Sequence, residues 1–253
     1  MFDKNIEYKL LRGKPINLKN GLIISQPKLD DIQNYCEDFG GYDAYEGLIY
    51  SLTRFSYEFK FDLEDAGIDY KEKNGFDIFL MLNSSDVQQT RKLLNLVFWH
   101  YNKEDKKYEL ENFNLYQKED SYYFKSEKSN CILDASSINE VREVFMKMFF
   151  MEKPRERKPK DDMAKELVKL DIEMKRKEKP KYDIYSIMDS LVWSDNTYDY
   201  ETIWSLTPHQ IYRGYNRVDR IKSFDYFMTG YYSGNIDSKD FKNKVSQVNW
   251  IGK

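Results

Sequence analysis

The chain has 253 residues, enough for one large domain or two smaller ones that each bury a hydrophobic core. Aromatic residues make up 16% of it and hydrophobic residues 41%, which excludes an unstructured, solvating chain. The formal net charge of -3 gives no support for a polyanionic partner. The first residues lack the apolar core of a signal peptide, and no apolar run approaches the ~18 residues of a membrane span. We therefore expect a cytoplasmic protein with no membrane association, in which Cys36 and Cys131 are reduced thiols.

Residues 1–150 are expected to form a mixed α+β body. A strand-like run at 6–11 is followed by a second short strand at 22–24, directly after the turn pair Asn20-Gly21. Pro27 then opens a helix that the glycines at 40–41 end. Residues 42–55 are predicted to form another helix, because their apolar side chains recur every three to four residues.

The second half of the body is predicted as a helix, a hairpin and a helix. Residues 85–88 have the S-x-x-Q spacing of a capping box, and the apolar side of the helix behind it continues to Tyr101. Strands are expected at 108–116 and 121–125, separated by a polar turn. The S-x-x-E spacing at 137–140 predicts the start of the last helix of the body.

A charged segment at 151–181 is expected to link this body to a C-terminal domain. Between residues 152 and 181 there are 12 Lys/Arg and 8 Asp/Glu, a net charge of +4. A narrow apolar stripe at helical spacing crosses the segment, formed by Met163, Leu167, Leu170 and Met174. The segment is either a solvated connecting helix that docks along one edge or a partner-binding helix with a polybasic surface. The first interpretation is favoured, because long charged runs are usually solvated.

Residues 182–253 are predicted to form a small all-α domain. A helix at 184–192 is broken by the polar residues at 194–196. Thr207-Pro208-His209-Gln210 predicts a helix start, with Thr as N-cap, Pro in the first turn and Gln completing a capping box. Residues 233–235 stop a further helix. A closing segment is expected around Val245, Val248 and Trp250.

Thirteen aromatic residues fall between Tyr182 and Tyr232, more than a small helical domain buries with every hydroxyl and indole nitrogen paired. One interpretation makes Trp193, Trp204, Tyr215 and Phe224 the core. The other places the surplus at a protein partner, namely Tyr198, Tyr200, Tyr212, Tyr231 and Tyr232. The predicted partner-binding residues are Trp204, Tyr212, Arg213, Tyr215, Arg217, Tyr231 and Tyr232, together with Leu167, Leu170 and Met174.

Arg213, Arg217 and Arg220 recur at helical spacing, which is the kind of surface that a DNA-reading helix presents. Asp219 and Asp225 interrupt the basic surface, so nucleic-acid binding is the less favoured alternative.

No catalytic chemistry, metal site or cofactor is predicted. His100 and His209 are the two histidines, no CxxC pair exists, and phosphate-binding, dinucleotide-binding and nucleophile-elbow motifs are all missing. Glu58-Phe59-Lys60 on a possible strand matches half of a metal-dependent nuclease motif, but the Pro-Asp half does not precede it. We therefore expect a protein that is not an enzyme, although an unfamiliar carboxylate site in the body stays open.

Two segments resemble tail-region proteins from phages of low-GC Gram-positive bacteria. They are residues 11–32, where LRGKP leads to IISQPKLDDI, and residues 203–212, IWSLTPHQIY, followed by Arg217 and Trp250. The resemblance implies a non-enzymatic tail or baseplate-hub assembly protein. It would act as a chaperone for a tape-measure or hub protein in the host cytoplasm. A structural component of the virion tail or baseplate is the alternative, and the oligomeric state stays open.

Overall fold

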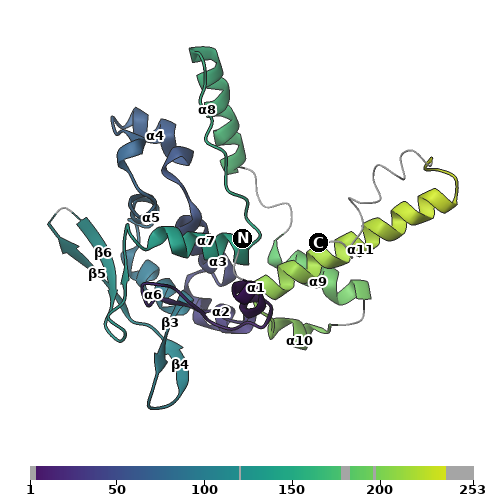
Figure 1. The fold of residues 1–253 in the computed structure, drawn as a ribbon, viewed down its shortest axis with the longest axis horizontal. Helices are drawn as coiled ribbons and strands as arrows, with labels where there is room; N and C mark the ends of the chain where they lie inside the picture. The colour runs from purple at the N-terminus through teal and green to yellow at the C-terminus, as the bar shows by residue number, and fades with distance from the viewer. Residues whose placement is uncertain (1–3, 120, 178–182, 196–197, 238–253) are drawn as a thin grey trace. The chain divides into compact units, whose positions relative to one another are not determined.

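The computed structural model describes residues 4–119, 121–177, 183–195 and 198–237 (Figure 1). The chain forms two compact units, Met1–Lys181 and Tyr182–Lys253. The first unit combines two small antiparallel sheets with many helices and the second is helical, so the predicted α+β body and helical C-terminal region are confirmed. The predicted closing segment around Val245, Val248 and Trp250 lies outside the described residues.

The N-terminal segment is a helix, α1 (Lys4–Leu11), so the strand predicted at residues 6–11 is wrong. A strand would turn Ile6, Tyr8 and Leu10 to the same side. Instead Leu10 is buried while Tyr8 is exposed. The Tyr8 hydroxyl accepts a hydrogen bond from Arg12 Nη1 at 2.7 Å, a contact between residues four apart that one helical turn allows.

The first sheet has four antiparallel strands in the order β1-β2-β3-β4. The strands are β1 (Ile16–Asn17), β2 (Ile23–Ile24), β3 (Phe98–Asn102) and β4 (Lys107–Leu110). The predicted turn at Asn20-Gly21 lies between β1 and β2: Asn20 Oδ1 accepts from Leu22 N at 3.1 Å, and Gly21 adopts φ +90°, which favours glycine. In β2, Ile24 lies opposite Phe98 of β3, which joins distant parts of the sequence.

The helix before β3, α6 (Val87–Val97), begins and ends at other residues than the sequence indicated. Its N-cap is Asp86, whose Oδ1 accepts from Gln89 N at 2.8 Å, so the capping box predicted at 85–88 is wrong. Phe98 to Tyr101, expected on the apolar side of the helix, lie on β3. Consecutive aromatic residues favour an extended backbone once flanking strands pair with them.

The second sheet contains the predicted hairpin, but the strand predicted at 108–116 is wrong. That stretch forms two strands in different sheets, β4 and β5, with Glu111 and Asn112 between them. Glu111 N donates to Phe98 O at 3.1 Å, which holds the chain at the crossing point. The second sheet has the order β5-β6-β7, with β5 (Phe113–Lys118), β6 (Ser121–Ser126) and β7 (Ile132–Leu133).

Buried side chains of α3, α5, α6 and α7 form much of the core of the first unit, and the unit contains further helices outside it. Besides α1 and α6, the helices of this unit are α2 (Leu29–Tyr35), α3 (Tyr42–Thr53), α4 (Lys60–Asp65), α5 (Gly75–Leu82), α7 (Ile138–Met148) and α8 (Asp162–Lys177). Short 3-10 turns occupy Glu37–Phe39, Ser56–Phe59 and Tyr70–Glu72. Helix α3 packs against α7, α5 and α6. Phe76 and Phe79 of α5 meet Phe124 of β6 edge-on, with ring centroids 6.4 and 6.0 Å apart, so the second sheet rests on α5.

The start of α7 differs from the prediction in its cap. The helix is present and its apolar side is buried, but the Ser137 hydroxyl makes no cap hydrogen bond, so the capping box predicted at 137–140 is wrong. Asp134 replaces it: its Oδ1 accepts from the backbone N–H groups of Ser136 at 2.9 Å and Ser137 at 3.0 Å.

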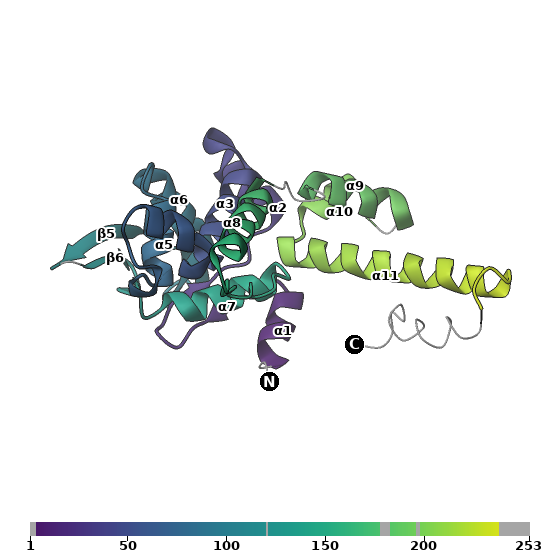
Figure 2. The ribbon, with the colours of Figure 1, turned by 90° about the horizontal axis from the view of Figure 1, so that it is seen from above.

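The second unit contains α9 (Ile184–Asp195), α10 (Tyr200–Trp204) and α11 (Pro208–Tyr232), and α9 runs along the first half of α11 (Figure 2). The capping box of Thr207 and Gln210 is confirmed. The further helix predicted before 233–235 is a continuation of α11, which spans 25 residues without a break. Gly214 faces α9, where a Cβ would lie 3.7 Å from the Leu191 side chain, an ordinary contact distance.

Candidate partner-binding surfaces

Two ion pairs attach one face of α8 to α4 within the first unit. Lys165 Nζ lies 3.1 Å from Glu64 Oε2, and Lys169 Nζ lies 2.5 Å from Asp65 Oδ2. The hydrogen bond to Asp65 raises the pKa of Lys169 above its ordinary value. Since two basic side chains of the predicted polybasic segment are paired in this way, they are not available as a cationic surface.

The extended segment before α8 is also attached to the first unit. The Tyr57 hydroxyl donates to Pro154 O at 2.7 Å, and the Tyr70 hydroxyl donates to Glu156 Oε1 at 2.8 Å. The hydrogen bond to Glu156, burial and neighbouring acids together raise the pKa of Tyr70. These contacts agree with the interpretation of a connector that docks along one edge.

The opposite face of α8 carries the predicted apolar stripe, and it is exposed. We call this surface the α8 stripe; its residues and exposed fractions are Met163 75%, Leu167 64%, Leu170 57% and Met174 58%. Figure 1 shows α8 projecting from the body of the unit. One face of the helix is thus held by ion pairs while the other presents apolar side chains to solvent, as a partner-binding role for Leu167, Leu170 and Met174 requires.

The α8 stripe has acidic flanks. At 3.6 residues per turn, Glu166 and Glu173 lie along one side of the stripe, and both are exposed. Asp171 lies along the other side, where its Oδ2 is 2.6 Å from Arg157 Nη1. The sequence indicated a net positive segment, but the charged α8 positions that border the stripe are acids, one of which is paired with Arg157.

The second unit presents an aromatic surface where the sequence predicted a core. Trp193 is 79% exposed, and Trp204, Tyr215 and Phe224 are each half-buried, so the core predicted from these four residues is wrong. The buried side chains are aliphatic instead: Ile184, Ile187, Met188, Leu191, Ile203 and Ile211. On α9, Ile184, Ile187, Met188 and Leu191 recur every three to four residues, which places them together on its buried face.

Trp193 is held in place although it is exposed. Its Nε1 donates to the Tyr200 hydroxyl at 3.0 Å, and that hydroxyl donates to Asp189 Oδ1 at 2.9 Å. A fixed, exposed Trp is typical of binding hot spots. Trp193 is not among the residues predicted to bind a partner, although its position after the last buried residue of α9 was a usable signal.

The predicted partner-binding residues of the second unit do not share one face. Trp204 is half-buried with its ring 6.3 Å from that of Tyr185. On α11, Tyr215 lies roughly 160° around the helix from Arg213, while Arg217 and Tyr231 lie near Arg213. Tyr212 falls between these faces and is half-buried. Tyr232 is exposed, with its ring 5.8 Å from that of Tyr231.

The basic residues of α11 do lie on one face, as nucleic-acid binding would require. Arg217 and Arg220 are exposed and Arg213 is half-buried. Asp219 and Asp225 are also exposed on the same helix. These acids lie about 120° around the helix from the three arginines, so α11 as a whole carries mixed charge.

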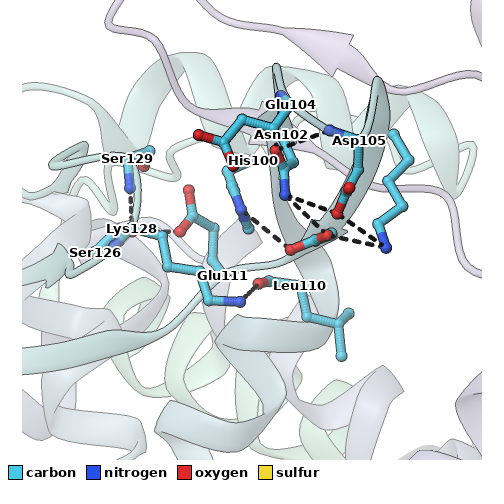
Figure 3. A network of polar contacts seen from close by, with 11 residues as sticks. His100, Asn102, Glu104, Asp105, Leu110, Glu111, Ser126, Lys128 and Ser129 are labelled. Carbon is cyan, nitrogen blue, oxygen red and sulfur yellow. Dashed lines mark hydrogen bonds and ion pairs between the residues drawn. The ribbon is translucent and has the colours of Figure 1, made fainter.

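The first unit holds a polar network where its two sheets meet (Figure 3). His100 Nε2 lies 3.5 Å from Glu109 Oε2, and Asn102 Nδ2 donates to the other oxygen of Glu109 at 3.2 Å. The hydrogen bonds from Asn102 and from Lys107, with the nearby positive charge, lower the pKa of Glu109. Glu109 thus contacts His100 and Asn102 of β3 and Lys107 of β4. These contacts hold the two strands together, which is a structural role.

The buried carboxylate of Glu111, which follows β4, makes a contact that links the first sheet to the second. It accepts a hydrogen bond from the Ser126 hydroxyl of β6. Lys128 Nζ, in the loop after β6, donates to Leu110 O at 2.8 Å. His100, predicted at the end of a helix, thus contributes to a strand pair.

The half nuclease motif has no suitable geometry. Glu58-Phe59-Lys60 lies on a 3-10 turn and the start of α4, so the strand predicted for it is wrong. Glu58 accepts from Phe55 N at 2.7 Å and pairs with Arg54 Nη1 at 2.9 Å. Within the described part of the chain, no cluster of three His, Cys, Asp or Glu side chains is arranged to hold a metal ion. Nor is any helix of that part long and apolar enough to cross a membrane.

Comparison with known proteins places a match on the C-terminal part of the chain. A family model described as the YomV second domain matches residues 175–253, a range that contains the whole second unit. Searches of curated proteins and of solved structures each found no match. YomV is a Bacillus phage-type protein, so the match associates this chain with phage proteins, and it does not distinguish tail or baseplate assembly from other phage functions.

Proposed function

We propose that this protein is a non-enzymatic assembly factor of the phage tail or baseplate hub. It acts as a chaperone that binds a tape-measure or hub protein in the host cytoplasm. The observation that carries the proposal is the α8 stripe, in which four apolar side chains stay exposed on a helix whose opposite face is ion-paired to α4. Contiguous exposed apolar surface of this kind is typical of protein-binding sites.

Two further observations support the phage context. The YomV match covers the second unit, and residues 11–32 and 203–212 resemble tail-region proteins. The non-enzymatic part of the proposal rests on the sequence, which carries no familiar nucleotide, acyl-transfer or metal motif. The fixed, exposed Trp193 offers a second contact surface for the same or another protein.

Affinity purification from phage-producing host cells tests the proposal. The tagged full chain is recovered after nuclease treatment, and bound proteins are identified by mass spectrometry. We expect a tape-measure or baseplate-hub protein in the eluate. Recovery of nucleic acid alone, in a parallel sample without nuclease, would contradict the proposal and favour the α11 arginine face.

The structural-component alternative makes a different prediction for mature particles. A chaperone leaves before assembly is complete, whereas a tail or baseplate component stays. Mass spectrometry of purified virions therefore separates the two: we expect the chain to be absent from virions and present in the lysate. Its presence in virions at the level of other tail proteins would replace the chaperone with a virion component.

A further inference from the structure

The α8 stripe has the spacing of a short helix-pairing surface. Its members follow one another at intervals of four, three and four residues, which is the apolar pattern of the coiled-coil heptad. Ala164, Val168 and Ile172 lie on other sides of the helix and are half-buried. A helix with this spacing on its free face is suited to pair with one other helix.

The charged residues beside the α8 stripe indicate which kind of partner helix could bind to it. Side chains that border the apolar seam of a helix pair face the corresponding positions of the partner helix. In α8 these positions hold Glu166, Asp171 and Glu173. Lys165 and Lys169 point to the opposite side of the helix, where Glu64 and Asp65 hold them.

A second copy of the chain does not fit this surface. In a parallel pair, Glu166 of one copy would face Asp171 of the other, an acid that Arg157 already engages, so this arrangement supplies little charge attraction. In an antiparallel pair, Glu166 would face Glu173. Neither arrangement therefore brings opposite charges together across the seam, and in the antiparallel pair the like charges oppose pairing.

We infer that the α8 stripe binds an amphipathic helix of another protein whose apolar seam is flanked by Lys or Arg. This inference rests on the proposed function in one respect, since it names the chemistry of the partner that the stripe receives. Attraction between the acidic flanks of α8 and basic flanks of the partner supplies selectivity, and the apolar seam supplies buried area.

Two dye-labelled probe peptides test the inference against the full chain. Both carry three heptads with the same leucine seam; one has Lys at every flanking position and the other has Glu. Fluorescence anisotropy should show binding of the Lys probe, with the Glu probe weaker by about tenfold because each flanking pair changes from attraction to repulsion. No binding of the Lys probe, or equal binding of the two probes, would overturn the inference.

Variants locate the binding on α8. Leu167→Ser with Leu170→Ser should abolish Lys-probe binding, and the matched control Met81→Ser, an exposed apolar residue of α5, should leave it unchanged. Glu166→Lys with Glu173→Lys should reverse the preference toward the Glu probe. Circular dichroism and the thermal midpoint confirm that each variant is folded, as expected for exposed positions.

Analytical sedimentation of the full chain tests whether a second copy of the chain covers the α8 stripe instead. Self-association that the Leu167→Ser, Leu170→Ser variant removes would show that a second copy covers the stripe, and it would overturn the inference. If the Lys probe does not bind, the inference about the basic-flanked helix fails, but the proposed function is still tested by co-purification of tail proteins. The two failures are therefore distinguishable.

Discussion

At the scale of single residues, Asp134 is the group on which the start of α7 most depends. Burial of its carboxyl group opposes ionisation, but hydrogen bonds from Ser136 and Ser137 outweigh it, and the pKa of Asp134 is lowered. We expect Asp134→Ala to reduce the free energy of unfolding by about 1 kcal/mol at pH 7, as loss of a helix cap does. Urea titration measures this, with Glu143→Gln on the exposed side of α7 as control.

The same carboxylate predicts a pH dependence. Because its pKa is depressed in the folded state, the stabilisation is present above the unfolded pKa of about 3.9 and is lost as the pH falls through the lower folded value. The difference in unfolding free energy between the native chain and Asp134→Asn should therefore shrink in acid. A difference that stays constant from pH 7 to acid would contradict this role.

The two cysteines should differ sharply in reactivity. Cys36 is buried, and burial raises the pKa of its thiol to about 11, whereas Cys131 is half-buried. At pH 8 about one Cys36 thiol in a thousand is ionised, so reaction with a disulfide reagent requires unfolding. We expect one fast thiol, lost in Cys131→Ser and kept in Cys36→Ser. The opposite pattern would contradict the burial of Cys36.

At the scale of elements, the ion pairs between α8 and α4 should control the mobility of α8. Lys165→Glu with Lys169→Glu places acids beside Glu64 and Asp65. Exposed ion pairs contribute little to stability, so the free energy of unfolding should change little. Hydrogen exchange of the α8 amides should rise, and adding Glu64→Lys with Asp65→Lys should restore protection. Unchanged exchange in the first variant would show that other contacts hold α8.

Elements with long local patterns were predictable and elements set by distant partners were not. The Thr207 capping box and the apolar periodicity of α3 and α7 depend on residues within one or two turns, and all are confirmed. The β3 strand forms at Phe98 because β2, far away in the sequence, pairs with it. No local pattern reports such a partner, so the helix predicted there extends too far.

The burial of individual side chains was also not predictable from the sequence. Arg142 is buried in the core of the first unit, with its guanidinium 4.2 Å from the Phe55 ring and a hydrogen bond of 2.8 Å to Asn139. A charged residue between apolar neighbours on a helix gives no signal of this. Trp193 is exposed because it lies about 200° around α9 from Leu191, away from the buried face, whereas its size alone had suggested a core residue.

At the scale of the whole molecule, ion pairs between helices determine which charged side chains stay available at the surface. The net charge of a segment therefore does not give the charge of the surface that it presents. The linker has a net positive composition, but the described borders of the α8 stripe are acidic, because α4 engages two of its lysines on the opposite face. The candidate surface therefore has the reverse sign from the one that composition indicates.

Quantitative co-purification from phage-producing cells tests most directly whether the protein acts by binding another protein through α8. The native chain, the Leu167→Ser, Leu170→Ser variant and the Met81→Ser control are recovered at equal amounts, and bound proteins are compared by mass spectrometry. We predict that one tail protein is recovered with the native chain and the control and is lost from the stripe variant. Equal recovery of that protein with all three chains would contradict a binding role for α8.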